Sequence, residues 1–220
     1  MAGTVTALRY QKRSRERVNV YLDGAFAFAL PAVVAATLRR GQHLSDAEIE
    51  RLQALDAEQR AYERCLRYLG RRSRSTAEVR GYLQRIGVPQ PTAEAVVGRL
   101  AAAGYLDDQA FAAAWVADRE RFRPRSQAAL RRELRQKGIA ESAIAQAVDR
   151  VDDEENAYRA ARPRAQRLAG LDARSFRQKL GGFLLRRGFS HEVVWPVVAQ
   201  LWQELHGPDD EQTELDWHEQ

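Results

Sequence analysis

The side chains of this sequence that could support catalysis are few and widely spaced. His43, His191, His206 and His218 show no spacing that would place two of them on one metal ion. Cys65, the only cysteine, excludes an internal disulfide and fits a reducing compartment. It falls on the apolar face of an expected helix, so we predict a buried thiol and not a nucleophile.

Two pairs of adjacent carboxylates, Asp107-Asp108 and Asp152-Asp153, are the remaining candidates for a metal-dependent active site. Both pairs precede expected helices, where aspartate acts as an N-cap, and we assign them that role. Gly181-Gly182 lacks the lysine and the preceding strand of a phosphate-binding loop. The sequence therefore predicts a protein that is not an enzyme, with no catalytic residue, no metal site and no cofactor.

Arginine supplies the chemistry that remains. Of the 35 basic residues, 32 are arginine, whose planar group binds phosphate in a bidentate manner. A GC-rich coding sequence would also favour arginine over lysine, so we rely on the sign of the charge alone. Residues 207–220 hold six acidic and no basic side chains, which leaves a net charge of +11 on residues 1–206. A body this basic favours a polyanionic partner.

The first 30 residues have the alternating pattern of strands. Residues 5–9 and 18–22 alternate apolar and polar side chains. Asp23-Gly24 is typical of a type I′ hairpin turn, after which residues 25–30 would form the return strand. We predict a small antiparallel sheet of about three strands, a number within the usual range, with strands only before about residue 30.

Helical signals follow the sheet. Pro31 would lie in the first turn of a short helix that ends near Gly41. Ser45 and Glu48 have the spacing of a capping box, which opens a helical stretch toward Leu69. Helices are expected to dominate from residue 45 onward.

A repeat of about 50 residues begins near residue 58 and determines the predicted fold. In each copy, two apolar residues four positions apart are followed by a glycine and another apolar residue: Val79, Leu83, Gly87 and Val88; Leu130, Leu134, Gly138 and Ile139; Leu180, Leu184, Gly188 and Phe189. The apolar pair marks one helix face. The glycine lies where a helix ends in a left-handed residue, so positive φ is predicted at all three glycines.

Each of these second helices is flanked by two others. The preceding helices carry Tyr62, Cys65, Leu66 and Leu69, then Phe111, Trp115 and Val116, then Tyr158 and Leu168. The following ones carry Val97 and Leu100, Val148 and Val151, and Val198 and Leu201. One such unit buries little alone, so the copies should stack into an elongated array. The predicted domains are an N-terminal extension at 1–57, three-helix repeats at 58–106, 107–151 and 152–206, and an acidic tail at 207–220.

Net charge alternates with this repeat. Residues 71–88, 119–138 and 159–188, around the second helices, carry +4, +6 and +8, whereas residues 89–118, 139–158 and 189–206 carry −3, −5 and −2. Stacked repeats would align the basic helices into a continuous positive stripe. Its main members would be Arg71, Arg72, Arg74, Arg119, Arg121, Arg123, Arg125, Arg131, Arg132, Arg135, Arg162, Arg164, Arg167, Arg174, Arg177 and Lys179.

The alternative is that these charges form a solvated face paired with the acidic helices, as Asp118 would pair with the arginines that follow it. We favour the binding stripe because the excess recurs three times on one type of helix. Arg123, Arg125 and Arg132 are expected to be exposed. For the acidic tail, which is expected to be disordered, solubility is the simplest role. The alternative is that the tail covers the stripe in the free protein and competes with its polyanionic partner.

Several motifs together resemble the RecX family: Leu66-x-x-Leu69, Arg72-x-Arg74-Ser75-x-x-Glu78, Gly104-Tyr105-Leu106-Asp107-Asp108-x-x-Phe111 and Glu133-Leu134-x-x-Lys137-Gly138-Ile139. Their order and spacing are similar to that family across residues 58–206. The segment Arg17-Val18-Asn19-Val20-Tyr21-Leu22-Asp23-Gly24 is similar to the extension of its longer members.

The resemblance implies three tandem three-helix units in a curved, mainly α-helical array. It also implies a regulator that binds the RecA filament on single-stranded DNA, with double-stranded DNA as an alternative partner, and inhibits its ATPase, strand-exchange and co-protease activities. DNA repair, recombination and the SOS response would be affected. No apolar run approaches the roughly 18 residues of a membrane helix, and the first ten residues lack a secretory apolar core, so we expect a cytoplasmic protein. We also expect a monomer.

Composition alone leaves a rival, which is a sequence-independent nucleic-acid-binding helical module or a transcriptional regulator. A repressor of that kind would need base-reading polar side chains on a recognition helix.

Overall fold

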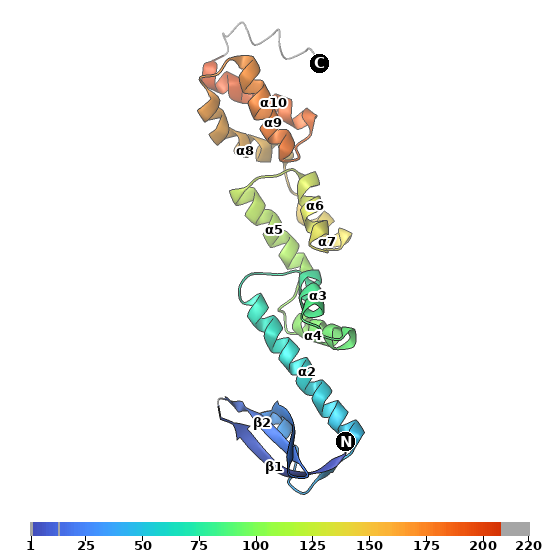
Figure 1. Ribbon diagram of the computed structural model, residues 1–220. Helices are drawn as coiled ribbons and strands as arrows, with labels where there is room; N and C mark the ends of the chain where they lie inside the picture. The colour runs from blue at the N-terminus through green and yellow to red at the C-terminus, as the bar shows by residue number, and fades with distance from the viewer. Residues whose placement is uncertain (1, 13, 208–220) are drawn as a thin grey trace. The chain divides into compact units, whose positions relative to one another are not determined.

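The computed structural model of the chain describes residues 2–12 and 14–207, and it divides into two compact units (Figure 1). The first unit comprises residues up to 74 together with 78–106. The second comprises residues 75–77 and everything from 107 onward. The predicted acidic tail from residue 208 lies outside the described residues.

The first unit opens with a four-stranded antiparallel sheet of order β3-β2-β1-β4. Its strands are β1 (Gly3–Gln11), β2 (Ser14–Leu22), β3 (Ala25–Pro31) and β4 (His43–Leu44). The first three were predicted. The expectation that strands occur only before about residue 30 was wrong, because β4 pairs with β1 through Gly3 and Thr4. Two residues are too few to show a strand pattern in a sequence, and tertiary pairing creates this strand.

The hairpin between β2 and β3 has the predicted backbone. Asp23 and Gly24 have φ of 48° and 87°, and a type I′ turn requires positive φ at both positions. The short helix that follows was predicted to end near Gly41, and this was wrong. Helix α1 (Ala32–Ala35) has a single turn. The chain then turns so that Gly41 N donates to Val5 O, which brings β4 to the edge of β1.

Helix α2 (Asp46–Leu69) runs unbroken from its predicted capping box, in which Ser45 and Glu48 bond to each other's backbone N–H. Its first half covers the sheet, and Ile49 packs on a core that includes Val5, Leu30 and Leu44. The buried Asp56 on α2 binds Arg17 of β2 at 2.8 Å and Arg60 at 2.7 Å. An aspartate buried between two arginines ties the sheet to the helix.

The second half of α2 packs with α3 (Thr76–Arg85) and α4 (Gln90–Ala102) around a core that includes Val79, Leu83 and Leu100. Cys65 belongs to this core and has no exposed surface. Burial raises the pKa of its thiol to about 11. The thiol is therefore protonated at neutral pH, as predicted for a core cysteine.

Residues 107–207 of the second unit form six helices in two groups of three. The first group is α5 (Asp108–Phe122), α6 (Gln127–Gln136) and α7 (Glu141–Val148), around Leu130, Leu134 and Ile144. The second is α8 (Asp153–Leu168), α9 (Ala173–Arg186) and α10 (His191–His206), around Phe176, Leu180 and Leu184. The mainly α-helical fold with three three-helix groups is confirmed.

The repeat glycines end the second helices as predicted. Gly87, Gly138 and Gly188 have φ of 76°, 73° and 93°. After each glycine the chain folds back, so that Ile139 N donates to Leu134 O and Phe189 N donates to Leu184 O. These bonds satisfy carbonyls that the helix end would otherwise leave unpaired.

Within the second unit, a serine hydroxyl bonds to the glycine turn that follows each second helix. Ser126, fully buried at the N-cap of α6, donates its Oγ–H to Gly188 O at 2.6 Å. Ser75 donates in the same way to Lys137 O at 2.6 Å. A Cβ at Gly188 would come within 2.9 Å of both Ser126 Oγ and Ala129 Cβ, so this approach requires glycine.

We therefore predict that Gly188→Ala destabilises the protein more than Gly87→Ala. Both changes place alanine in the left-handed region, which costs about 1–2 kcal/mol. Gly87 faces open space, whereas Gly188→Ala also forces Ser126 and Ala129 apart, for about 1–3 kcal/mol more. Urea unfolding followed by circular dichroism measures both free energies. Equal losses would mean that the contact with Ser126 is not tight.

Candidate nucleic-acid interface

The first aspartate of each pair caps the helix that follows, as predicted, whereas the second bonds to the first residue of a different helix. Asp107 accepts from the backbone N–H of Gln109 and Ala110, and Asp152 caps α8 in the same way. Asp108 accepts from Thr76 N at 2.8 Å, and Asp153 accepts from Gln127 N at 2.7 Å. Within residues 2–12 and 14–207, no three His, Cys, Asp or Glu side chains are grouped so that they could hold a metal ion.

Glu133 on α6 organises the arginines that flank the segment between α5 and α6. It accepts from Trp115 Nε1 and Arg119 Nε at 2.8 Å each, and it pairs with Arg125 at 3.0 Å. Asp118 also lies 3.5 Å from Arg119, as the pairing alternative expected. Arg125 was expected to be exposed, but 61% of its side chain is covered (39% exposed) and it has an ion-pair partner. Arg119 and Arg125 are therefore held by carboxylates.

Three arginines gather where the α5–α6 segment meets the end of α9. Arg187 donates to Pro124 O at 3.0 Å. Burial, and then repulsion by Arg125 and Arg123, lowers the pKa of Arg187. Arg123 is exposed and has no ion-pair partner among the described residues. Bringing like charges together opposes folding, and a bound phosphate would relieve the repulsion.

The outer side of α6 adds three of the predicted arginines. Arg132 is exposed and unpaired within the described part of the chain. Arg131 is half-buried and lies within electrostatic range of Asp153 and Glu141. Arg135 pairs with Glu141, whose pKa is lowered by the hydrogen bond from Arg135. Arg121 on α5 lies over its neighbour Phe122, whose ring is largely exposed.

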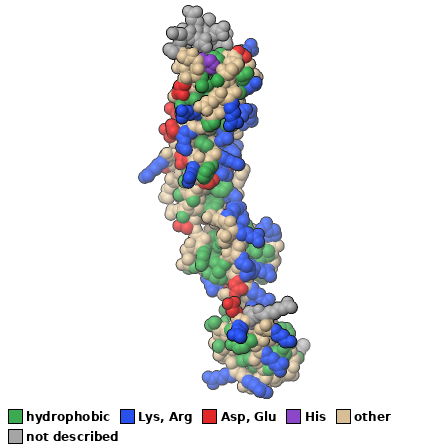
Figure 2. Space-filling view, turned by 90° about the vertical axis from the view of Figure 1, so that its left-hand side faces the viewer, with side chains coloured by type: hydrophobic (Ala, Val, Ile, Leu, Met, Phe, Trp, Pro, Cys, Tyr) green, Lys and Arg blue, Asp and Glu red, His purple; other side chains and the backbone are tan. Residues whose placement is uncertain are grey.

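The third three-helix group carries its basic residues on α8 and α9. Arg164 lies over the ring of Phe183, and Arg177 lies over the ring of Trp195, each at 4.9 Å. The other predicted members on these helices are exposed: Arg162, Arg167, Arg174 and Lys179. Figure 2 shows clusters of Lys and Arg side chains on the surface of the second unit.

In the first unit the predicted arginines have local partners. Arg72 pairs with Glu78 at 2.9 Å. Arg74 lies over the ring of Tyr68 at 4.2 Å, and its guanidinium is 3.8 Å from Glu78. Arg71 is exposed. Part of the positive charge is thus neutralised within the unit, as the pairing alternative proposed.

Ion pairs between the second and third helices neutralise some of the basic residues but not all of them. Arg80 on α3 forms a bidentate pair with Glu94 on α4, as Arg135 on α6 does with Glu141 on α7. Exposed pairs of this type contribute little to stability. The predicted residues that keep an exposed charge without a carboxylate partner in the described chain are Arg71, Arg121, Arg123, Arg132, Arg162, Arg164, Arg167, Arg174 and Lys179. The continuous stripe itself stays a prediction.

Arg187 is a member of this surface that the sequence reasoning missed. It directly precedes Gly188, as Lys137 precedes Gly138, so the repeat alignment held the signal. Lys137 lies over Trp115 and Arg187 lies over Phe183, at 5.1 and 4.6 Å. A basic residue before the repeat glycine therefore recurs beside an aromatic ring in both groups of the second unit.

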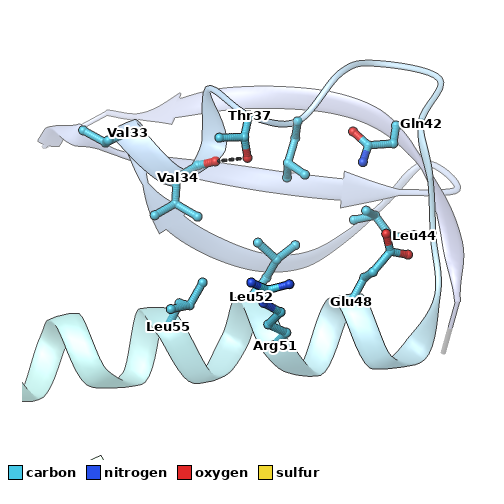
Figure 3. Close-up of a pocket in the computed structure, with 10 residues that line it drawn as sticks. Val33, Val34, Thr37, Gln42, Leu44, Glu48, Arg51, Leu52 and Leu55 are labelled. Carbon is cyan, nitrogen blue, oxygen red and sulfur yellow. Dashed lines mark hydrogen bonds between the residues drawn. The ribbon is translucent and has the colours of Figure 1, made fainter. Parts of the chain in front are cut away.

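A pocket of about 460 Å³ lies between the α1 segment and α2 (Figure 3). Its lining is mainly apolar, with Val34, Leu44 and Leu52 among its walls. Its one carboxylate, Glu48, is already bonded in the capping box. The residues that line this pocket therefore include no group of side chains suited to catalysis. None of the described helices is long and apolar enough to cross a membrane.

The fold and the basic surface define a class of protein: a helical-repeat protein in which an N-terminal sheet is followed along the chain by three-helix domains. Models of the RecX family match the chain in four parts. The RecX N-terminal domain matches residues 3–45, and the first, second and third three-helix domains match 61–100, 107–148 and 152–198. The chain belongs to the RecX family.

Named relatives agree with this assignment. Regulatory protein RecX of Bacillus subtilis is 32% identical over 215 residues, covering 96% of this chain and 80% of the relative. That of Levilactobacillus brevis is 32% identical and covers 97% and 81%. A crystal structure of regulatory protein RecX has a TM-score of 0.71 at 28% identity, covering 92% of this chain and 99% of that one. A RecX structure from Lactobacillus salivarius, 21% identical with a TM-score of 0.59, shares the fold.

We predict that Glu133→Gln destabilises the second unit, whereas Glu141→Gln does not. Glu133 is half-buried and accepts from three side chains, and a hydrogen bond to a charged group contributes about 1.5–3 kcal/mol. Glu141 and its partner Arg135 are exposed, so its loss should change the unfolding free energy by less than about 0.5 kcal/mol. Both variants remove one negative charge, and urea unfolding compares them. Equal effects would show that net charge, not the Glu133 contacts, determines stability.

Proposed function

We propose that this protein regulates RecA, mainly as an inhibitor, by binding the RecA–single-stranded DNA filament. It suppresses ATP hydrolysis, strand exchange and co-protease activity, and so modulates recombinational repair and the SOS response. It acts in the cytoplasm as a monomer, without catalytic residues, metal or cofactor. Membership of the RecX family, whose relatives are named regulatory proteins, supports this proposal.

The single structural observation that carries the proposal is the gathering of Arg123, Arg125 and Arg187 on the second unit. Such a cluster fits a phosphate of the DNA backbone or a carboxylate of RecA. Arg132, on the helix that follows this segment, adds an unpaired charge. The aromatic rings beneath several arginines hold their guanidinium groups in place without neutralising them.

The double variant Arg123→Ala/Arg132→Ala should lose inhibition while keeping its stability. Arg125 is left in place because it pairs with Glu133. Two charge-assisted hydrogen bonds, each contributing about 1.5–3 kcal/mol, would raise the half-inhibitory concentration roughly 100-fold or more. The measurement is ATP hydrolysis by RecA from the same source, preassembled on single-stranded DNA.

Arg150→Ala is the matched control, since Arg150 is exposed in the same three-helix group but lies at the end of the acidic α7. It should inhibit like the unchanged protein. If a folded Arg123→Ala/Arg132→Ala variant inhibits normally, the second unit does not bind the filament through this surface.

Salt dependence provides a second prediction for the same surface. Each phosphate contact to single-stranded DNA contributes a slope of about 0.7 in the logarithm of affinity against the logarithm of salt concentration. The double variant should therefore reduce this slope by about 1.4 if both arginines contact phosphates. Fluorescence anisotropy of a labelled oligothymidylate measures it. An unchanged slope would direct these arginines to RecA protein and away from DNA.

The rival function, sequence-independent binding of nucleic acid alone, predicts a different pattern. Such a module would affect RecA only by competing for free DNA. Under the rival function, inhibition of ATP hydrolysis would disappear when excess single-stranded DNA is added. Under the proposed function, the protein would still inhibit the assembled RecA filament.

A further inference from the structure

The face of the N-terminal sheet that carries Arg9, Tyr21 and Phe26 has a ladder of aromatic and cationic side chains across three strands. Phe26 of β3 pairs with Tyr21 of β2, and their rings meet edge to face with centroids 6.0 Å apart. The guanidinium group of Arg9 on β1 lies over the Tyr21 ring, 5.3 Å from its centroid. Phe26 is 59% exposed, which is unusual for so large an apolar side chain.

A pocket of about 600 Å³ adjoins this ladder. It is lined by Thr6, Ala7, Leu8, Arg9, Tyr21, Gly24 and Arg40, none of which is acidic. Arg40 comes from the segment before β4, which is fixed to β1 by the bond from Gly41 N to Val5 O. The β4 pairing, absent from any sequence pattern, is therefore what brings a second guanidinium beside Arg9.

The N-terminal segment has the sign of charge of a nucleic-acid site. Residues 1–44 contain seven basic and two acidic side chains, and the net charge of +5 falls to +4 when Arg17, which pairs with Asp56 of α2, is left out. One of the two carboxylates, Asp23, is occupied in accepting from Thr4 N at the hairpin. Figure 2 shows Lys and Arg side chains on the surface of the sheet region. The proposed regulation of RecA through the three-helix groups uses none of this charge.

We propose that this sheet face is a separate binding site for single-stranded nucleic acid. A base stacks on Tyr21 or Phe26, and the neighbouring phosphate lies in the pocket between Arg9 and Arg40. Aromatic faces beside guanidinium groups are the usual means of binding unpaired strands without sequence preference. A duplex hides the faces of its bases, so it can reach the arginines but not the stacking surface.

Stability alone does not account for the arrangement. Cross-strand aromatic pairs and an arginine over a ring do stabilise a sheet modestly, and they explain Tyr21 and Arg9. They leave Arg40 unexplained, because it is exposed and has no ion pair or hydrogen bond within the described residues. They also explain only part of Phe26, which remains 59% exposed although its ring pairs with Tyr21. A bound strand would engage both.

Photochemical crosslinking with DNA alone tests the site directly. The full chain is irradiated with an oligothymidylate that contains 5-iodouracil, which forms adducts with stacked aromatic rings. Trypsin cleaves after Arg17 and Arg39, so Tyr21 and Phe26 lie on one peptide, residues 18–39. An adduct on Tyr21 or Phe26 is expected. Adducts confined to other peptides would overturn the proposal.

Affinity measurements give a second, independent test. In the Arg123→Ala/Arg132→Ala background, Arg40→Ala and Phe26→Ala should each weaken binding of a short oligothymidylate by roughly tenfold. Arg39→Ala is the matched control, because Arg39 is exposed and adjacent but does not line the pocket. Equal losses for Arg39→Ala and Arg40→Ala would reduce the effect to general charge and overturn the site.

Two further outcomes would also overturn it. Equally tight binding of a duplex of the same length would show that no base stacks on the ladder. Unchanged DNA binding by Phe26→Ala and Arg40→Ala, together with lost inhibition of RecA, would assign the face to a protein partner. The crosslinking and affinity measurements use DNA without RecA. Their results are therefore independent of whether the protein inhibits the RecA filament.

Discussion

The hydrogen bond from Ser126 Oγ to Gly188 O is the contact on which the second unit depends. Gly188 follows the C-cap of α9, and its left-handed backbone points its own carbonyl toward the N-terminus of α6. The same Oγ accepts a hydrogen bond from Ala129 N. One buried hydroxyl therefore caps the N-terminus of α6 and also binds the glycine turn that follows α9. Only a glycine at 188 leaves room for this approach.

This joint also positions the basic surface. The α5–α6 segment that leads into Ser126 carries Arg123 and Arg125, and the helix end that accepts its hydroxyl carries Arg187. The same approach that satisfies the backbone therefore brings three guanidinium groups together. Pro124 O and Glu133 bind two of them and hold the cluster against its own repulsion. The proposed binding surface therefore depends on the fold, because the segments that form the joint also carry the three arginines.

In the first unit, a buried ion pair, and not a serine–glycine hydrogen bond, joins the sheet to the helices. Helix α2 serves both the sheet and the first three-helix group, and the buried Asp56 fixes the sheet to it through Arg17. The outer sheet face then remains open, with aromatic rings and arginines in place of the arginine-rich helices of the second unit. The two proposed binding surfaces have the same sign of charge, but only the sheet face presents an exposed aromatic ring beside a pocket lined by arginines.

The sequence by itself determined the helices of the three repeats, the glycine ends of their second helices and most of their cores, but it misplaced the end of α1. These features are local: a 3.6-residue apolar period, a capping box at Ser45, and a glycine after each second helix. It also determined the hairpin at Asp23-Gly24 and the capping role of Asp107 and Asp152. The apolar pair and its glycine were the strongest of these signals, because they recur in all three copies of the repeat.

Tertiary structure alone decided which arginines keep a free charge. Arg123 and Arg125 are two residues apart and looked equivalent in the sequence, yet Glu133 binds only Arg125. Arg187 joins them from more than 60 residues away, and β4 brings Arg40 beside Arg9 through a pairing of two residues. Ion pairs and edge strands depend on which segments meet in space. No local periodicity records that, so the candidate sites emerged only when the chain was folded.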